Sequence, residues 1–144
     1  MKEETKLMIS KFKIYELGYD FMGYPLNYAN KITFHHLIIP SRLNGPIVGW
    51  NCAILCDLTS HTYLHIIEHH DEEAFYNITS ELIDINIKGY LDYENLFQIN
   101  EILNTFEEEY ADTKNGSGKK IIKEIYKKRV LKWKKHFYIK FLFP

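Results

Sequence analysis

Histidines are the residues of this sequence best suited to chemistry, because six of the seven lie between residues 35 and 70. A neutral imidazole is a common ligand of divalent transition metals, and its pKa of about 6.5 lets it accept a proton near neutral pH. The cluster therefore indicates a metal site or a site of acid–base chemistry. A single histidine is more often a structural side chain than a functional one. The spacing of the histidines must therefore decide whether this cluster is functional.

His61 and His65 have the spacing of a metal-binding helix. Residues four positions apart share one helix face, with Cβ atoms about 6 Å apart, so that both imidazoles can reach one ion. His69 continues the same stripe and is an alternative ligand. A third ligand must come from another element, and His35 or His36 is the obvious donor.

His35 and His36 are adjacent in TFHHLIIP, residues 33–40, a stretch that otherwise has the composition of a buried β-strand. Successive side chains of a strand point to opposite faces, so the two imidazoles cannot bind one ion in regular β geometry. One can be a ligand while the other is free to take a proton. The alternation therefore predicts different roles for the two residues.

Strands and a helix must position these histidines. We expect strands over residues 12–17, 31–39 and 51–56, with a loop over residues 40–50 that is rich in proline and glycine. A helix capped by Thr59 or Ser60 should then run to about residue 70. The centre of the chain is thus predicted to be strand, loop, strand and helix.

Further helices are expected after this core. One should be capped by Asp71 and end at Gly89, and the next should be capped by Asp92. Their apolar stripes are Phe75, Ile78, Leu82 and Ile85 in the first, and Leu96, Ile99, Leu103, Phe106 and Tyr110 in the second. Residues 114–118 form a break, after which the pattern predicts a basic amphipathic helix.

The bulk composition fits one globular domain. The chain has 144 residues, with 46% apolar and 26% charged residues. No stretch approaches the roughly 18 apolar residues of a membrane span, and the N-terminal residues lack the apolar centre of a secretion signal. Two cysteines in one short segment suggest a reducing compartment, so we expect a cytoplasmic protein without membrane partners.

Charge is distributed very unevenly along the chain. Residues 1–113 carry 7 Lys or Arg against 18 Asp or Glu, whereas residues 114–144 carry 11 basic residues and one acid, Glu124. Such an asymmetry indicates a basic arm that meets a polyanion or an acidic partner, although a helix with a solvated lysine face is equally compatible.

The central segment resembles the HNH nucleases, which have the ββα-metal fold. The resemblance covers residues 34–65 and rests on His35-His36, Pro40, Gly45, Asn51, Leu55-Cys56 and His61. His65 is similar to the extra histidine of the DNase colicins. The resemblance implies an α+β fold, with a ββα core at about residues 31–70 of a domain spanning residues 1–113. Many relatives carry two Cys-x-x-Cys pairs, but Cys52 and Cys56 are the only cysteines here, so no structural zinc is expected.

The resemblance also implies roles for single residues. His35, His61 and His65 would bind one divalent metal ion, His36 would be the general base, and Asn51 would brace the loop that aims His36. Three imidazoles favour zinc, nickel or manganese over magnesium. The implied activity is metal-dependent endonucleolytic hydrolysis of DNA.

Basic residues would supply the contacts to DNA. Arg42, in the loop between the strands, is the nearest candidate for binding phosphate. The C-terminal arm would add non-specific attraction through Lys119, Lys120, Lys123, Lys127, Lys128, Arg129, Lys132, Lys134 and Lys135.

Two other functions remain open from the sequence. The chain could be a non-catalytic ββα module that binds nucleic acid or protein, as an inhibitor or accessory factor of a phage or other mobile element. Alternatively, His35, His61 and His65 could hold a metal that only stabilises the fold. A role for His36 as a base would favour the enzyme.

Overall fold

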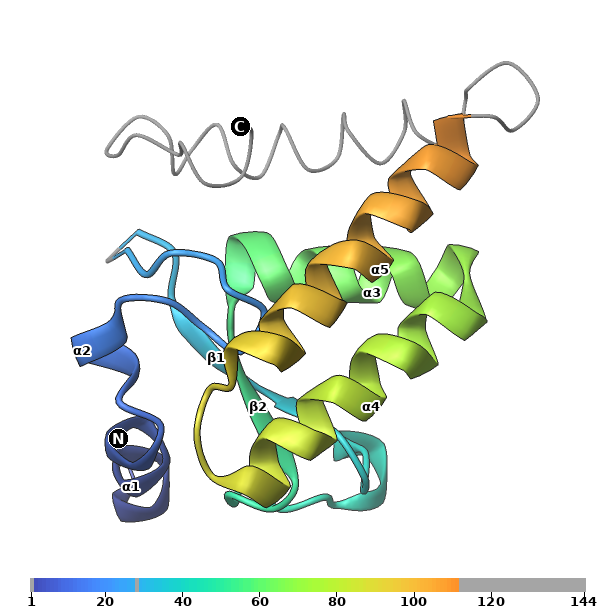
Figure 1. The fold of residues 1–144 in the computed structure, drawn as a ribbon. Coiled ribbons are helices and arrows are strands. Elements are labelled where there is room, and N and C mark those ends of the chain that lie inside the picture. Colours follow the sequence, from blue (N-terminus) through green and yellow to red (C-terminus); the bar gives the residue numbers. More distant parts are fainter. Residues whose placement is uncertain (1, 28, 112–144) are drawn as a thin grey trace.

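The computed structural model describes residues 2–27 and 29–111, so the predicted C-terminal arm at residues 114–144 lies outside the described part of the chain. The described residues combine helices with a two-stranded antiparallel sheet, which agrees with the predicted α+β class. The elements, shown in Figure 1, are α1 (Glu3–Lys11), α2 (Ile14–Leu17), β1 (Ile32–His36), β2 (Cys52–Cys56), α3 (Thr62–His70), α4 (Glu72–Lys88) and α5 (Tyr93–Ala111).

The strands β1 and β2 form a hairpin that leads directly into α3. Ile32 pairs with Cys56 and His36 pairs with Cys52 at the two ends of the ladder. The connecting loop contains a short 3₁₀ turn, η1 (Ser41–Leu43), and a π-helical turn, η2 (Asp57–His61), joins β2 to α3. The predicted order of strand, loop, strand and helix is therefore confirmed, with strands shorter than expected.

The predicted strand over residues 12–17 is wrong. Residues Ile14–Leu17 form one helical turn, closed by a hydrogen bond from the Gly18 N–H to the Ile14 carbonyl at 2.8 Å. Gly18 ends this turn with a φ of 81°, a conformation that glycine adopts without strain. The alternation of Phe12 and Ile14 mimics a strand, but Phe12 is buried from the end of α1 and Ile14 from the start of α2.

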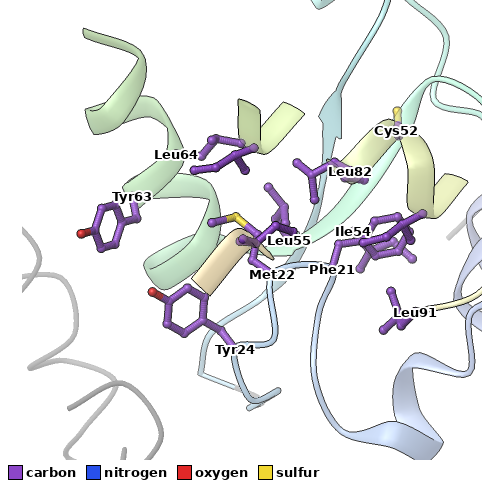
Figure 2. Packing of buried hydrophobic residues seen from close by; sticks show 14 of the residues in the cluster. Phe21, Met22, Tyr24, Cys52, Ile54, Leu55, Tyr63, Leu64, Leu82 and Leu91 are labelled. Carbon is purple, nitrogen blue, oxygen red and sulfur yellow. The ribbon is translucent and has the colours of Figure 1, made fainter. Parts of the chain in front are cut away.

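The strand β2 runs through the centre of the molecule, and all five of its residues are buried. A strand covered on both faces requires a continuous apolar run, which CAILC supplies. Figure 1 shows α1 and α2 to one side of the hairpin and α3 to α5 to the other. Figure 2 shows Ile54 and Leu55 of β2 among side chains from the N-terminal loop, α3 and α4, including Phe21 and Leu82.

Both predicted caps of α4 are confirmed. The Asp71 carboxylate accepts a hydrogen bond from the Ala74 N–H at 3.0 Å, and Gly89 closes the helix with a φ of 84°. Ile78, Leu82 and Ile85 are buried as expected, although Ala74 is buried more deeply than Phe75.

Helix α5 also follows its prediction within the described residues. Asp92 lies at its start and accepts a hydrogen bond from the Glu94 N–H at 3.0 Å. Ile99, Leu103 and Phe106 are buried, Leu96 is half-buried, and the side chain of Tyr110 lies outside the described part. No helix in residues 2–27 and 29–111 has both the length and the apolar character to cross a bilayer.

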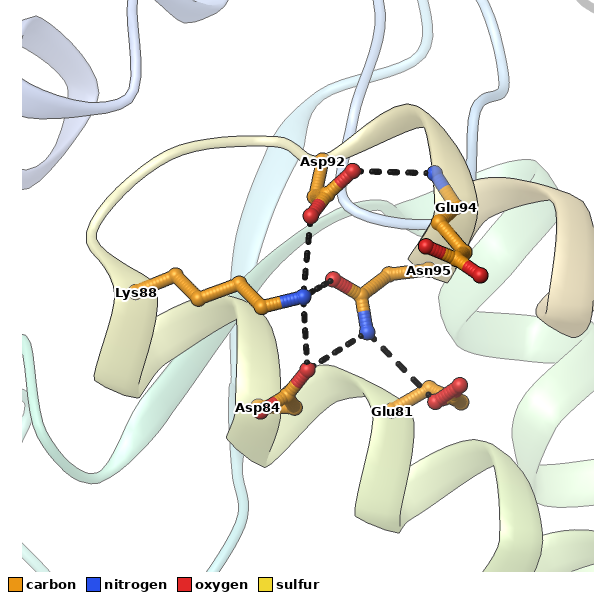
Figure 3. Close-up of polar contacts among 6 residues, drawn as sticks. All are labelled: Glu81, Asp84, Lys88, Asp92, Glu94 and Asn95. Carbon is orange, nitrogen blue, oxygen red and sulfur yellow. Dashed lines mark hydrogen bonds and ion pairs between the residues drawn. The ribbon is translucent and has the colours of Figure 1, made fainter.

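Polar side chains join α4 to α5 across their short connection (Figure 3). The Lys88 ammonium lies 3.0 Å from the Asp84 carboxylate and 2.9 Å from that of Asp92, and it donates to the Asn95 carbonyl at 3.0 Å. Asn95 in turn donates to Asp84 at 2.9 Å. One lysine thus links Asp84 of α4, Asp92 of the connection and Asn95 of α5.

A buried carboxylate holds the end of β2 and the turn η2. Asp20 accepts hydrogen bonds from the Met22 and Tyr24 N–H groups through Oδ1, and from the Cys56 N–H and the Ser60 hydroxyl through Oδ2. Burial raises the pKa of Asp20, while these four donors oppose that effect by favouring the charged form. Asp20 therefore ties the N-terminal loop to the element that carries His61.

Asn30 holds η2 from the other side. Its side-chain carbonyl accepts from the Leu58 N–H at 2.6 Å, and its amide donates to the Thr59 hydroxyl at 3.1 Å. The predicted capping role of Thr59 or Ser60 is wrong, because helical geometry begins at Asp57 and both hydroxyls are used in these buried hydrogen bonds.

The Asp20→Asn variant should be strongly destabilised. Either orientation of the amide places an NH₂ group against at least one backbone N–H that can only donate, which costs about 1–3 kcal/mol in a buried site. Asp71→Asn is the matched control, because asparagine caps a helix about as well as aspartate. Urea unfolding curves should give a much lower midpoint for D20N than for D71N, and equal midpoints would contradict the assigned role.

Candidate metal centre

Three histidines from three elements converge at one end of the hairpin. His35 comes from β1, His61 ends the turn η2, and His65 lies one turn along α3. One ring nitrogen from each of the three lies within 4.8 Å of the others. The predicted set of His35, His61 and His65 is therefore brought together in space.

The spacing of the His35 and His61 nitrogens suits a shared metal ion. His35 Nδ1 lies 3.4 Å from His61 Nε2. Two imidazole nitrogens that each lie about 2.0–2.1 Å from a tetrahedral zinc ion are about 3.3–3.4 Å apart. These two rings already have the separation of a bound pair, and a rotation of the exposed His65 side chain can adjust the third ligand.

The solvent exposure of the three rings increases from His35 to His61 to His65. His35 is buried with 7% of its surface exposed, His61 is half-buried and His65 is exposed. The ring centroids lie 4.8 Å apart for His61 and His65, and 5.4 Å apart for His35 and His65. The cluster therefore has a closed side at β1 and a side at α3 that solvent or a substrate can reach.

The two inner histidines are held in the neutral form. Burial lowers the pKa of His35 to about 3, and the neighbouring imidazoles of His61 and His65 add to this effect. Burial also lowers the pKa of His61 to about 4, again with a contribution from His65. Neutral imidazoles keep the lone pairs that a divalent cation requires, so the donor set fits such an ion at neutral pH.

Two neighbouring side chains orient the outer nitrogens of this cluster. His61 Nδ1 lies 2.7 Å from the Thr33 hydroxyl, and His65 Nδ1 lies 3.1 Å from the Glu68 carboxylate. For His61, the contact at Nδ1 leaves Nε2 facing His35. For His65, the hydrogen bond at Nδ1 leaves Nε2 as the nitrogen without this partner. Partners of this kind are common for metal-binding histidines.

His36 lies apart from the cluster and is held by the loop. Its Nε2–H donates to the Gly45 carbonyl at 3.1 Å, which leaves a lone pair on Nδ1. Gly45 approaches the backbone closely, since a Cβ there would lie 1.9 Å from the Ile39 carbonyl oxygen. Only glycine fits this position, so the carbonyl that orients His36 depends on it.

Asn51 holds the two ends of the loop together. It is fully buried, and its side-chain carbonyl accepts from the Ile38 and Ile39 N–H groups at 3.0 and 2.8 Å. Its amide donates to the Ile39 and Pro46 carbonyls, each at 3.0 Å. These four hydrogen bonds fix the chain on either side of η1, including the segment that carries the Gly45 carbonyl.

Other predicted site residues do not join the cluster. Arg42 lies exposed in η1, and His69 is exposed at the end of α3 outside the group of three histidines. Cys52 and Cys56 are buried free thiols, and burial raises the pKa of both, which disfavours the thiolate that binds zinc. The predicted DNA contacts outside the described residues are Lys119, Lys120, Lys123, Lys127, Lys128, Arg129, Lys132, Lys134 and Lys135.

Sequence reasoning missed three residues that hold His61 or the turn that carries it, namely Thr33, Asp20 and Asn30. Thr33 lies two positions before His35, and the strand period of two places both on one face, so this contact could have been expected. Asp20 and Asn30 carry no comparable signal, because each lies in an irregular segment far from the turn that it holds.

Comparison with known proteins gives no match: no family model, no curated protein and no solved structure is similar enough to assign this chain to a family.

The stability of the metal-free protein should depend on pH through His35. The folded protein keeps this ring neutral, whereas the unfolded chain binds a proton below about pH 6.5, so acid favours unfolding. His35→Gln removes this titration. Relative to H35Q, the wild type should lose stability with a slope approaching 1.4 kcal/mol per unit from about pH 6 to about pH 5. Urea unfolding with a chelator present measures this difference, and parallel pH profiles would contradict it.

Proposed function

We propose that this protein is a metal-dependent endonuclease of the HNH type, which hydrolyses phosphodiester bonds in DNA. The proposal rests on the arrangement at the end of β1. His35 joins His61 and His65 in one cluster, while the adjacent His36 is held separately by Gly45. A metal-binding group beside an independently held imidazole supplies a Lewis acid and a base. The ββα-metal core would then consist of β1, β2 and α3.

His36 is the general base in this proposal. With its hydrogen on Nε2 donated to the Gly45 carbonyl, Nδ1 can take a proton from a water molecule. The water oxygen forms a bond to phosphorus as the proton leaves. The phosphorus–oxygen bond to the departing group then breaks, and that oxygen takes up a proton from solvent.

Asn51 positions the base without touching the substrate. Its hydrogen bonds to Ile38, Ile39 and Pro46 hold the loop on either side of η1. Because Gly45 directly precedes Pro46, these bonds also fix the carbonyl that orients His36. Loss of Asn51 would therefore misdirect the base and leave the three clustered histidines in place.

His35, His61 and His65 would hold one divalent ion. When bound, the ion would stabilise negative charge on the scissile phosphate and on the departing oxygen. Three imidazole ligands suit zinc, nickel or manganese better than magnesium, which prefers oxygen ligands. The chain's own contribution is to bring three ring nitrogens together on a face that is open at His65.

Binding of DNA must overcome the net negative charge of residues 1–113. Residues 1–113 have 11 more acidic than basic residues, and this charge would repel a polyanion. In the proposal, Arg42 contacts the phosphate nearest to the loop. The 11 basic residues between positions 114 and 144 supply the non-specific attraction.

Cleavage of supercoiled plasmid with Mg²⁺, Mn²⁺, Ni²⁺ or Zn²⁺ tests this function. His36→Ala should lower the cleavage rate by about 10²–10⁴-fold, the usual contribution of a general base. It should leave metal affinity nearly unchanged, because His36 does not belong to the cluster. Metal titration by calorimetry and gel analysis of the plasmid measure the two effects separately.

His35→Ala and His69→Ala are matched controls in the same assay. H35A should lose metal affinity as well as cleavage, whereas H69A should retain both because His69 lies outside the cluster. Cleavage by H36A at the wild-type rate would refute the mechanism. DNA binding by the wild type without cleavage under any of the four metals would favour a non-catalytic module instead.

A further inference from the structure

The Thr33 hydroxyl lies between a backbone carbonyl and one of the clustered histidines. Its oxygen is 2.6 Å from the Leu55 carbonyl oxygen and 2.7 Å from His61 Nδ1. Thr33 and Leu55 are directly paired in the β1–β2 ladder, so the first contact is built into the register of the hairpin. The second contact joins β1 to His61, the last residue of η2.

The hydrogen positions in this chain of contacts follow from the chemistry of its members. A carbonyl oxygen can only accept, so the single hydroxyl hydrogen of Thr33 must point to Leu55. Without that hydrogen, two oxygens 2.6 Å apart would repel each other. The hydroxyl oxygen therefore accepts from His61, which requires the His61 hydrogen to be on Nδ1.

This assignment determines which nitrogen of His61 can bind a metal. With the hydrogen on Nδ1, the lone pair is on Nε2, the atom that lies 3.4 Å from His35 Nδ1. The other neutral tautomer would turn an N–H group toward the cluster and leave Nδ1 with no hydrogen to donate to Thr33. A valine at position 33 would remove this preference without changing the size of the side chain much.

We propose that Thr33 is a positioning residue that holds His61 in the Nδ1–H tautomer, so that Nε2 is presented to the metal. This inference rests on the proposed metal centre, because His61 must be one of its ligands. Thr33 itself touches neither metal nor substrate and acts only through the His61 ring. Its position on β1, two residues before His35, lets one strand supply a ligand and the support for another.

Thr33→Val and Thr33→Ser test the proposal in the full-length chain. In the metal-free wild type and T33S, nitrogen chemical shifts of the imidazoles should assign the hydrogen of His61 to Nδ1. In T33V the same spectrum should show a mixture of tautomers. Competition with a chelator should show zinc affinity about 10–100-fold weaker for T33V and similar to wild type for T33S, the usual size of such an effect.

The two readouts separate the failure of this inference from the failure of the proposed function. If wild-type protein binds zinc and T33V matches it in both tautomer and affinity, the role of Thr33 is refuted and the centre stands. If no form binds zinc, the centre is refuted, and the inference that rests on it is refuted too. Retained dispersion in the amide spectrum of T33V shows that the variant is folded.

Discussion

Successive side chains of a β-strand point to opposite faces, and this constraint organises the whole candidate site. It sends His35 into the buried side of the hairpin, where it meets His61 and His65. It sends His36 toward the loop, where the Gly45 carbonyl holds its Nε2–H. Two chemically identical neighbours thereby acquire different surroundings from backbone geometry alone. The proposed division between ligand and base begins with this alternation.

The alternation places His35, but other contacts must bring the remaining ligands to it. The turn η2 carries His61 to the cluster, and polar side chains from earlier in the chain hold this turn: Asp20 through Ser60, Asn30 through Thr59, and Thr33 through His61 itself. A π-helical turn is uncommon and is often found at functional sites. Here its geometry is maintained by hydrogen bonds from three separate segments, so the precision of the cluster depends on the interior of the fold.

Local patterns predicted much of this structure. β-Branched and aromatic residues indicated β1, and a short apolar run indicated β2. Asp71 and Gly89 marked the ends of α4 because capping is a short-range interaction. Histidine spacing predicted that the His61 and His65 rings lie together, and the resemblance of residues 34–65 to the HNH nucleases supplied His35 as the third. The predictions failed where distant partners decide the outcome. Within residues 2–27 and 29–111 no strand pairs with residues 12–17, and Thr59 and Ser60 face Asn30 and Asp20 instead of capping a helix. A single sequence carries no signal for such long-range hydrogen bonds.

The central claim is that His35, His61 and His65 bind one metal ion through three imidazole nitrogens. X-ray absorption spectroscopy of zinc-loaded protein at one equivalent tests it most directly. The account predicts three imidazole ligands at about 2.0–2.1 Å, seen by their multiple-scattering pattern, with the remaining coordination from light atoms of solvent. A coordination shell of oxygen atoms with at most one imidazole, or sulfur at about 2.3 Å from Cys52 or Cys56, would contradict it.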